Sequence, residues 1–136
     1  MGKHVIEMTA AERELVVAEM RANLVGLERE AALALERRRA EAWALARATA
    51  RTLRQQFGAT RVVLFGSLAR GDFTPWSDVD ILAYGIPESL RLAAMADLSV
   101  ERHRPGHLAL DVLAAEEMSG AFIEAAEAEG VEIHGD

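Results

Sequence analysis

The sequence predicts an α+β (or α/β) domain, a small sheet with helices on one face, preceded by a long N-terminal helix. Two observations predict this class: a long proline-free stretch rich in Ala, Leu, Glu and Arg, and then three short apolar runs separated by turn and helix signals. We expect residues 1–8 to be a flexible N-terminus, residues 9–56 to be a helical segment that serves as an interface, and residues 57–136 to be the compact domain.

The N-terminal helix begins with a capping box, Thr9 followed three residues later by Glu12. From there to Gln56 only Gly26 interrupts the helix formers, so we expect one long helix or two helices that meet near Gly26. An apolar stripe with heptad-like spacing needs a covering surface, and another chain is favoured over a fold-back because no turn sequence interrupts it. The stripe comprises Val17, Met20, Leu24, Leu27, Ala31, Leu35, Ala42, Leu45, Thr49 and Leu53.

The compact domain reads as alternating strands and helices. Its strands are expected at "TRVVLFG" (60–66), "VDILAYG" (79–85) and "HLALDVLA" (107–114). A helix that ends before a turn at Pro105 and Gly106 is expected between the last two strands. A second helix, over 114–130 and including Gly120, is expected before a short terminal strand or tail, "VEIHG".

Composition narrows the function classes. No cysteine is present, which excludes disulfides and thiolate metal sites, and no run has the apolar length of a signal peptide or membrane span, so we expect a cytoplasmic protein without membrane contact. A net charge of -7 argues against direct nucleic-acid binding. Eight arginines nevertheless lie between Arg37 and Arg70 against one acid, Glu41; they form either a solvated helix face or a contact for phosphates or an acidic partner.

Three aspartates are the candidate metal ligands. In the second strand Asp78 and Asp80 share one face, within about 7 Å at the backbone. Asp111 is the only charge in the third strand. If the two strands are neighbours, three carboxylates converge on one edge of the sheet, an oxygen-rich site of the kind that suits Mg²⁺. Without a cation, their repulsion would raise one pKa or push the side chains apart.

A candidate phosphate site lies upstream. The first strand ends in Gly66 and Ser67, where a glycine lets phosphate approach the backbone and a serine offers its hydroxyl beside free amides. Arg70 follows one turn later and is expected either to brace a phosphate oxygen or to pair with one of the aspartates.

Together, "GSLARG", "SDVDIL", "LDV" and "FIEAAEAEGVEIHG" resemble the minimal nucleotidyltransferase (MNT) family of the DNA polymerase beta-like superfamily, over about Leu53 to the C-terminus. The resemblance implies a mixed sheet and transfer of a nucleotidyl group, AMP from ATP first of all, to a hydroxyl. It implies that Gly66 and Ser67 hold phosphates, that Asp78 and Asp80 ligate two Mg²⁺ ions, and that Asp111 ligates the catalytic ion and helps to deprotonate the acceptor. Leu68 stands where the family often has arginine.

The same resemblance implies a partner. Members of this kind are paired with a HEPN toxin, which they neutralise by adenylylating a tyrosine or by binding, so we expect an MntA-like antitoxin that forms a homo-dimer or hetero-oligomer through the N-terminal helix. A catalytically vestigial antitoxin that acts by binding alone remains the alternative, as does transfer to a small molecule or an RNA end.

Other aromatic and histidine side chains are weaker candidates. Trp76 either stacks on a base or, as we favour, packs against the sheet rim, and Trp43 is expected to be an interface or core anchor. His103 and His107 lack metal-ligand spacing, so no catalytic role is expected for them.

Overall fold

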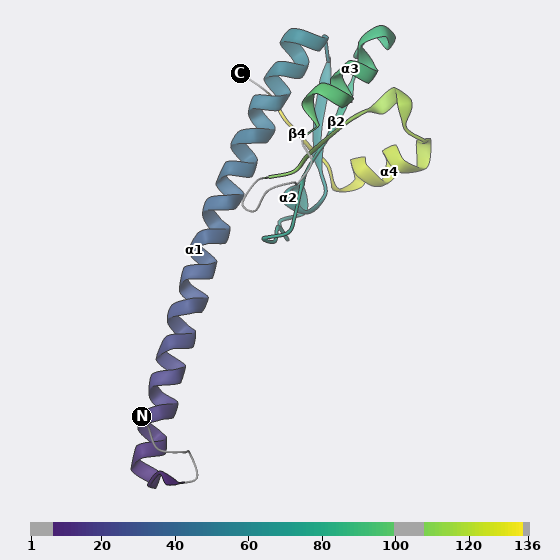
Figure 1. Cartoon of the computed structure of the whole chain (residues 1–136). Coiled ribbons are helices and arrows are strands. Elements are labelled where there is room, and N and C mark those ends of the chain that lie inside the picture. The colour runs from purple at the N-terminus through teal and green to yellow at the C-terminus, as the bar shows by residue number, and fades with distance from the viewer. Residues whose placement is uncertain (1–6, 100–107, 135–136) are drawn as a thin grey trace. The chain divides into compact units, whose positions relative to one another are not determined.

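The computed structural model describes residues 7–99 and 108–134 and confirms the α+β class (Figure 1). By their internal contacts the residues form two compact units, Met1–Glu36 and Arg37–Asp136. The described elements are α1 (Ala10–Phe57), β1 (Arg61–Phe65), α2 (Ser67–Arg70), β2 (Val79–Tyr84), α3 (Glu88–Leu98), β3 (Leu110–Ala114), the 3₁₀ turn η2 (Ala115–Glu117), α4 (Gly120–Glu129) and β4 (Val131–Glu132).

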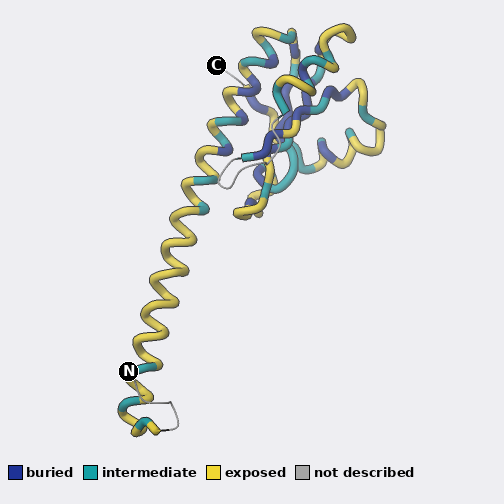
Figure 2. The backbone as a smooth tube through the Cα atoms, in the orientation of Figure 1, coloured by how far each residue is buried: buried dark blue, intermediate teal, exposed yellow. Residues whose placement is uncertain are grey.

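The helix α1 is continuous through Gly26, so of the two alternatives the sequence left open, one long helix is confirmed and a break at Gly26 is not found. Its first turn is capped by Thr9, whose Oγ1 accepts a hydrogen bond from the Glu12 amide at 3.1 Å. In the first unit nearly every residue of the helix is exposed (Figure 2). The large apolar residues exposed there are Leu15, Val17, Met20, Leu24, Val25, Leu27 and Leu33.

The part of α1 in the second unit has one buried side, which belongs to the domain core (Figure 2). Trp43 follows the first residue of this buried side, Ala42, and is partly buried, as an anchor in the core would be. Small residues dominate the buried side of the helix, which permits close packing of the helix on its neighbours. Its buried residues are Ala42, Ala46, Thr49, Ala50 and Leu53.

The sheet is mixed, with strand order β3-β2-β1-β4. The strand β1 pairs antiparallel with both β2 and β4, whereas β2 and β3 are parallel neighbours joined through α3. Parallel pairing requires such a crossover, and α3 packs against β3. The three expected strands and the short terminal strand are therefore confirmed.

The sequence predicted helices on one face of the sheet, and this expectation is wrong because both faces are covered. On one face Val63 and Leu82 form a cluster with Ala115 and Ala126, the latter from α4. The side chains that point the other way are also fully buried, at no more than 1% exposed: Val62, Leu64, Ile81, Ala83 and Val112. Since a strand buried on both sides needs cover on both, α3 and the second part of α1 supply the remaining buried apolar surface.

The expected helix over 114–130 is divided, because Ser119 starts a new helix. After η2, the Ser119 hydroxyl accepts a hydrogen bond from the Phe122 amide at 3.2 Å and caps α4. The expected turn at Pro105 and Gly106 lies outside the described residues, as do His103 and His107. No helix in residues 7–99 or 108–134 combines the length and apolar character needed to cross a membrane.

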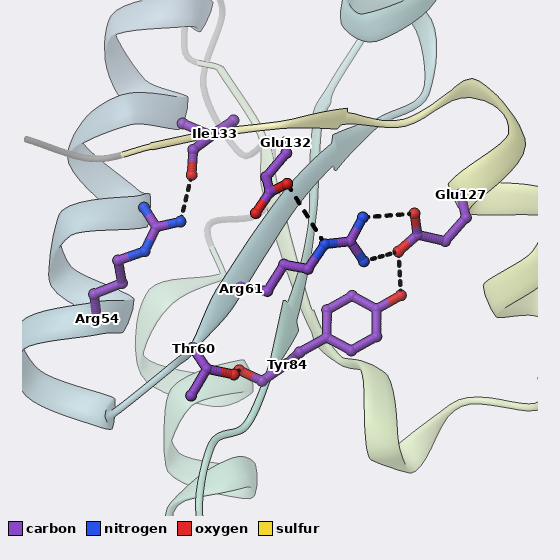
Figure 3. A network of polar contacts seen from close by, with 7 residues as sticks. All are labelled: Arg54, Thr60, Arg61, Tyr84, Glu127, Glu132 and Ile133. Carbon is purple, nitrogen blue, oxygen red and sulfur yellow. Dashed lines mark hydrogen bonds and ion pairs between the residues drawn. The ribbon is translucent and has the colours of Figure 1, made fainter.

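A polar network ties α4 to the sheet (Figure 3). Arg61 on β1 donates to Glu127 on α4, with Nη2 and Oε2 3.0 Å apart, and the Tyr84 hydroxyl on β2 donates to the same carboxylate. Arg61 also lies over the Tyr84 ring, 5.1 Å from its centroid. Beyond β4, the Ile133 carbonyl accepts from Arg54 of α1 at 2.6 Å. The contacts of Glu127 link α4 to β1 and β2, and the bond of Arg54 links α1 to the segment after β4.

Candidate active site

The parallel pairing of β2 and β3 brings two aspartates side by side. Asp80 and Asp111 are register partners on adjacent strands, so their side chains project from the same face of the sheet. Asp111 is exposed between buried neighbours, which matches the expected alternation of the third strand. Asp78 lies just before β2, in the loop that leads to Asp80. The structure thus gathers the three aspartates that the sequence singled out at one end of two neighbouring strands.

Burial and nearby like charges both act on the carboxylate of Asp80. Burial and the charges of Asp111, Asp78 and Glu129, in that order, raise the pKa of Asp80 from 3.8 to about 6. Only Arg70 acts in the opposite direction. A carboxylate that is disfavoured by desolvation and by like charges is one whose ionised form a bound cation would stabilise.

The donor set fits a hard divalent cation, since carboxylate oxygens are the ligands that Mg²⁺ prefers. Within the part of the chain that the structure describes, no three acidic or histidine side chains are already arranged as a metal-binding cluster. Asp78 and Asp111 both act on Asp80 as like charges, and a cation is the complement that would draw the oxygens of the three residues together.

Gly66 lies directly beside Asp80, where β1 ends. Its backbone has φ +79° and ψ −161°, a conformation that glycine adopts readily and other residues rarely. A Cβ at this position would overlap Oδ2 of Asp80. Ser67 is partly buried and begins the single turn of α2, in which the Arg70 amide donates to the Gly66 carbonyl at 3.0 Å. The glycine-serine pair and the aspartates therefore share one end of the sheet.

Arg70 pairs with two acids, neither of which is a candidate metal ligand. Its Nη1 donates to Oε2 of Glu129 at 2.8 Å, and its Nε lies 3.3 Å from Oδ1 of Asp72. The pairing expected with Asp78, Asp80 or Asp111 is therefore not the one described.

Glu129 is the residue that sequence reasoning missed. Besides Arg70 it accepts a hydrogen bond from the Gly66 amide, at 3.0 Å to Oε1. The bonds from Arg70 and from Gly66 lower the pKa of Glu129. The only sequence signal was its position in the closing "EAEG", which carries no chemical pattern of its own.

The loop before Asp78 is held by Thr74 and Ser77. The Thr74 amide donates to the Ser77 hydroxyl at 2.9 Å, and the Ser77 amide donates to the Thr74 carbonyl at 3.1 Å. Trp76, within this turn, is 79% exposed. The expectation that it packs against the rim of the sheet is therefore wrong, because the turn directs the residue outward.

Comparisons with known proteins agree with this geometry. Residues 46–126 match the family model of the nucleotidyltransferase domain. A crystal structure of a Sulfolobus solfataricus protein proposed to be a nucleotidyltransferase superposes with a TM-score of 0.50 at 24% identity, over 73% of this chain and 85% of that one; this likeness shows the fold. No protein of curated function matches the chain significantly. Since the matched segment exceeds half of the chain and contains Gly66, Ser67 and all three aspartates, the chain belongs to the nucleotidyltransferase domain family.

Proposed function

We propose that the protein transfers a nucleotidyl group, AMP from ATP, to a hydroxyl in a reaction that depends on Mg²⁺. The observation that carries the proposal is the placement of Asp80 beside its register partner Asp111 and against Gly66. In this proposal the aspartates that bind metal and the glycine-serine pair that binds phosphate lie next to each other at one end of the sheet. Transfer of a nucleotidyl group needs both in one site.

Each side chain has a role in this proposal. Asp78, Asp80 and Asp111 would hold Mg²⁺, which when bound neutralises phosphate charge and aligns the attacking and leaving oxygens. Gly66 admits the triphosphate close to the backbone because it has no Cβ, and Ser67 offers its hydroxyl. Arg70 contributes a guanidinium to the same phosphates. Asp111, which is exposed at the edge of the group, would accept the proton of the acceptor hydroxyl.

The acceptor in this proposal is a tyrosine hydroxyl of a HEPN-domain partner, for which the protein acts as antitoxin. Support comes from the first unit, where α1 exposes seven large apolar side chains, between 42% and 67%. A helix whose large apolar side chains are exposed gains little stability from tertiary packing. Such a surface therefore favours contact with another chain. A second copy of this chain would satisfy the same requirement, and solution mass separates the two occupants.

The test is transfer of label from α-³²P-labelled ATP to the purified HEPN partner in the presence of Mg²⁺. We expect Asp78→Asn and Asp111→Asn to lower transfer about 100-fold or more. The matched control is Asp97→Asn, an exposed acid on α3 that loses the same charge away from the site.

Two outcomes would contradict the proposal. Equal labelling by the Asp78→Asn variant and the wild type would exclude the three aspartates as the catalytic group. Toxin neutralisation by that variant without any labelling would instead identify an antitoxin that acts by binding alone.

A further inference from the structure

Glu129 accepts hydrogen bonds from two groups beside the expected phosphate position, the Gly66 amide and the Arg70 guanidinium. One carboxylate oxygen accepts from the Gly66 amide at 3.0 Å and the other accepts from Arg70 at 2.8 Å. The side chain is 28% exposed, so the pair lies at the surface of the site rather than in the core. A phosphate group placed on Gly66 and Arg70 would use two oxygens for the same two donors.

The backbone fixes Glu129 at this place. It is the last residue of α4, and a Cβ on the following residue, Gly130, would lie 2.5 Å from Cγ1 of Val63 on β1. Close approach of Gly130 to β1 is therefore possible only without a side chain. Immediately afterwards Val131 and Glu132 pair with β1. The fold therefore holds the backbone of Glu129 beside the end of β1, and this placement does not depend on Arg70 alone.

We propose that Glu129 is an internal competitor for the phosphate site: its carboxylate holds Gly66 and Arg70 in the nucleotide-free protein and is displaced when a triphosphate binds. The role assigned to Glu129 rests on the proposed function. Two anions cannot share one amide hydrogen, and a carboxylate left nearby repels the incoming phosphate. Displacement also leaves Arg70 paired with phosphate, so the ion pair is exchanged and not lost.

The same helix provides a matched control. Glu127 lies one half-turn earlier and makes an ion pair of similar exposure with Arg61 of the sheet, and it also accepts a hydrogen bond from the Tyr84 hydroxyl. Glu127→Gln and Glu129→Gln each remove one negative charge from α4. A difference between them in nucleotide binding therefore reports the phosphate site and not the net charge of the helix.

The experiment measures binding by isothermal titration calorimetry with Mg²⁺, using α,β-methylene ATP, which cannot donate its nucleotidyl group, and inorganic triphosphate, which lacks the base. We expect Glu129→Gln to bind both probes about twofold to fivefold more tightly than wild type, the range that corresponds to a partly exposed ion pair. Glu129→Ala should do the same, and Glu127→Gln should match wild type. Thermal unfolding of each variant verifies that it is folded.

The outcomes separate this inference from the proposed function. If wild type binds the ATP analogue and the two Glu129 variants bind it equally or more weakly, the competitor role is wrong and the proposed function stands. If no form of the protein binds the analogue, both are wrong.

A measurement on the wild type needs no substitution. The Gly66 amide resonance should shift with the same saturation curve as triphosphate binding, because its acceptor changes from carboxylate to phosphate. A Gly66 resonance unmoved at saturation would overturn the competitor role.

Discussion

Asp80 and Asp111 are register partners on parallel strands, and of the neighbouring charges Asp111 is the one that most raises the pKa of Asp80. The pairing places two acids beside each other where neither has a cationic partner on its own strand. A half-buried carboxylate in that position lowers the stability of the folded chain at neutral pH, and the cost is measurable.

The first prediction concerns pH. Because the pKa of Asp80 is raised from 3.8 to about 6, the folded state binds a proton that the unfolded state has released. The contribution of Asp80 to the free energy of unfolding should therefore fall as pH rises from about 4 to about 6. Asp80→Asn should remove this fall and be more stable at pH 7 by up to about 3 kcal/mol. Urea unfolding at several pH values measures it, with Asp97→Asn as the control; parallel curves for all three proteins would contradict the prediction.

The second prediction concerns the cation. In the absence of nucleotide, Mg²⁺ should raise the free energy of unfolding at pH 7, by about 1.4 kcal/mol at ten times its dissociation constant. Chelation should reverse the effect. Asp80→Asn should abolish it, because the substitution removes the carboxylate that we propose binds Mg²⁺. Thermal unfolding in MgCl₂ against NaCl of equal ionic strength measures it. A rise of the same size in the variant would place cation binding elsewhere.

The third prediction uses two glycines in opposite surroundings. Gly66→Ala forces an alanine to φ +79° and its Cβ into Asp80, so we expect lower stability and loss of nucleotide binding. Gly26→Ala, in an open stretch of α1 where a Cβ meets nothing within 4 Å, should stabilise the helix by up to about 1 kcal/mol. Circular dichroism and calorimetry measure both. An active, stable Gly66→Ala variant would remove the steric argument for the glycine.

The fourth prediction concerns the exposed stripe of the first unit. Replacing Leu24 and Leu27 together by glutamate should reduce the solution mass to that of a monomer, because apolar burial between chains is lost. Light scattering after size exclusion measures it. The control, Arg29→Glu, changes the net charge by the same amount at an exposed position outside the stripe. A wild-type protein that is monomeric with a folded helix, alone and with its partner, would exclude the interface.

Much of the fold was predictable because its signals are local. The alternation in "VDILAYG" sets the faces of β2, and that in the third strand sets Asp111 apart from its buried neighbours. The division of the last helix was not predictable from composition, because a single serine among strong helix formers gives a weaker signal than the helix formers around it.

The candidate site was predictable only in part. The glycine-serine pair and the three aspartates form a sequence pattern, whereas the bond between Gly66 and Glu129 joins residues 63 positions apart. That contact depends on β4 pairing with β1. The sequence indicated a short terminal strand or tail, but two residues do not indicate which strand they pair with. Trp76 was misplaced for a related reason: the hydrogen bonds of Thr74 and Ser77 orient the turn, and hydrophobicity alone does not.

The two-residue strand β4 has a consequence for the order in which the protein is made. Until residues 129–133 leave the ribosome, β1 lacks its outer neighbour and the Gly66 amide lacks its carboxylate. A growing chain therefore carries an open strand edge, able to pair with other polypeptides, until residues 129–133 have been made. Closure of that edge and completion of the candidate site at the end of the sheet then occur in the same event.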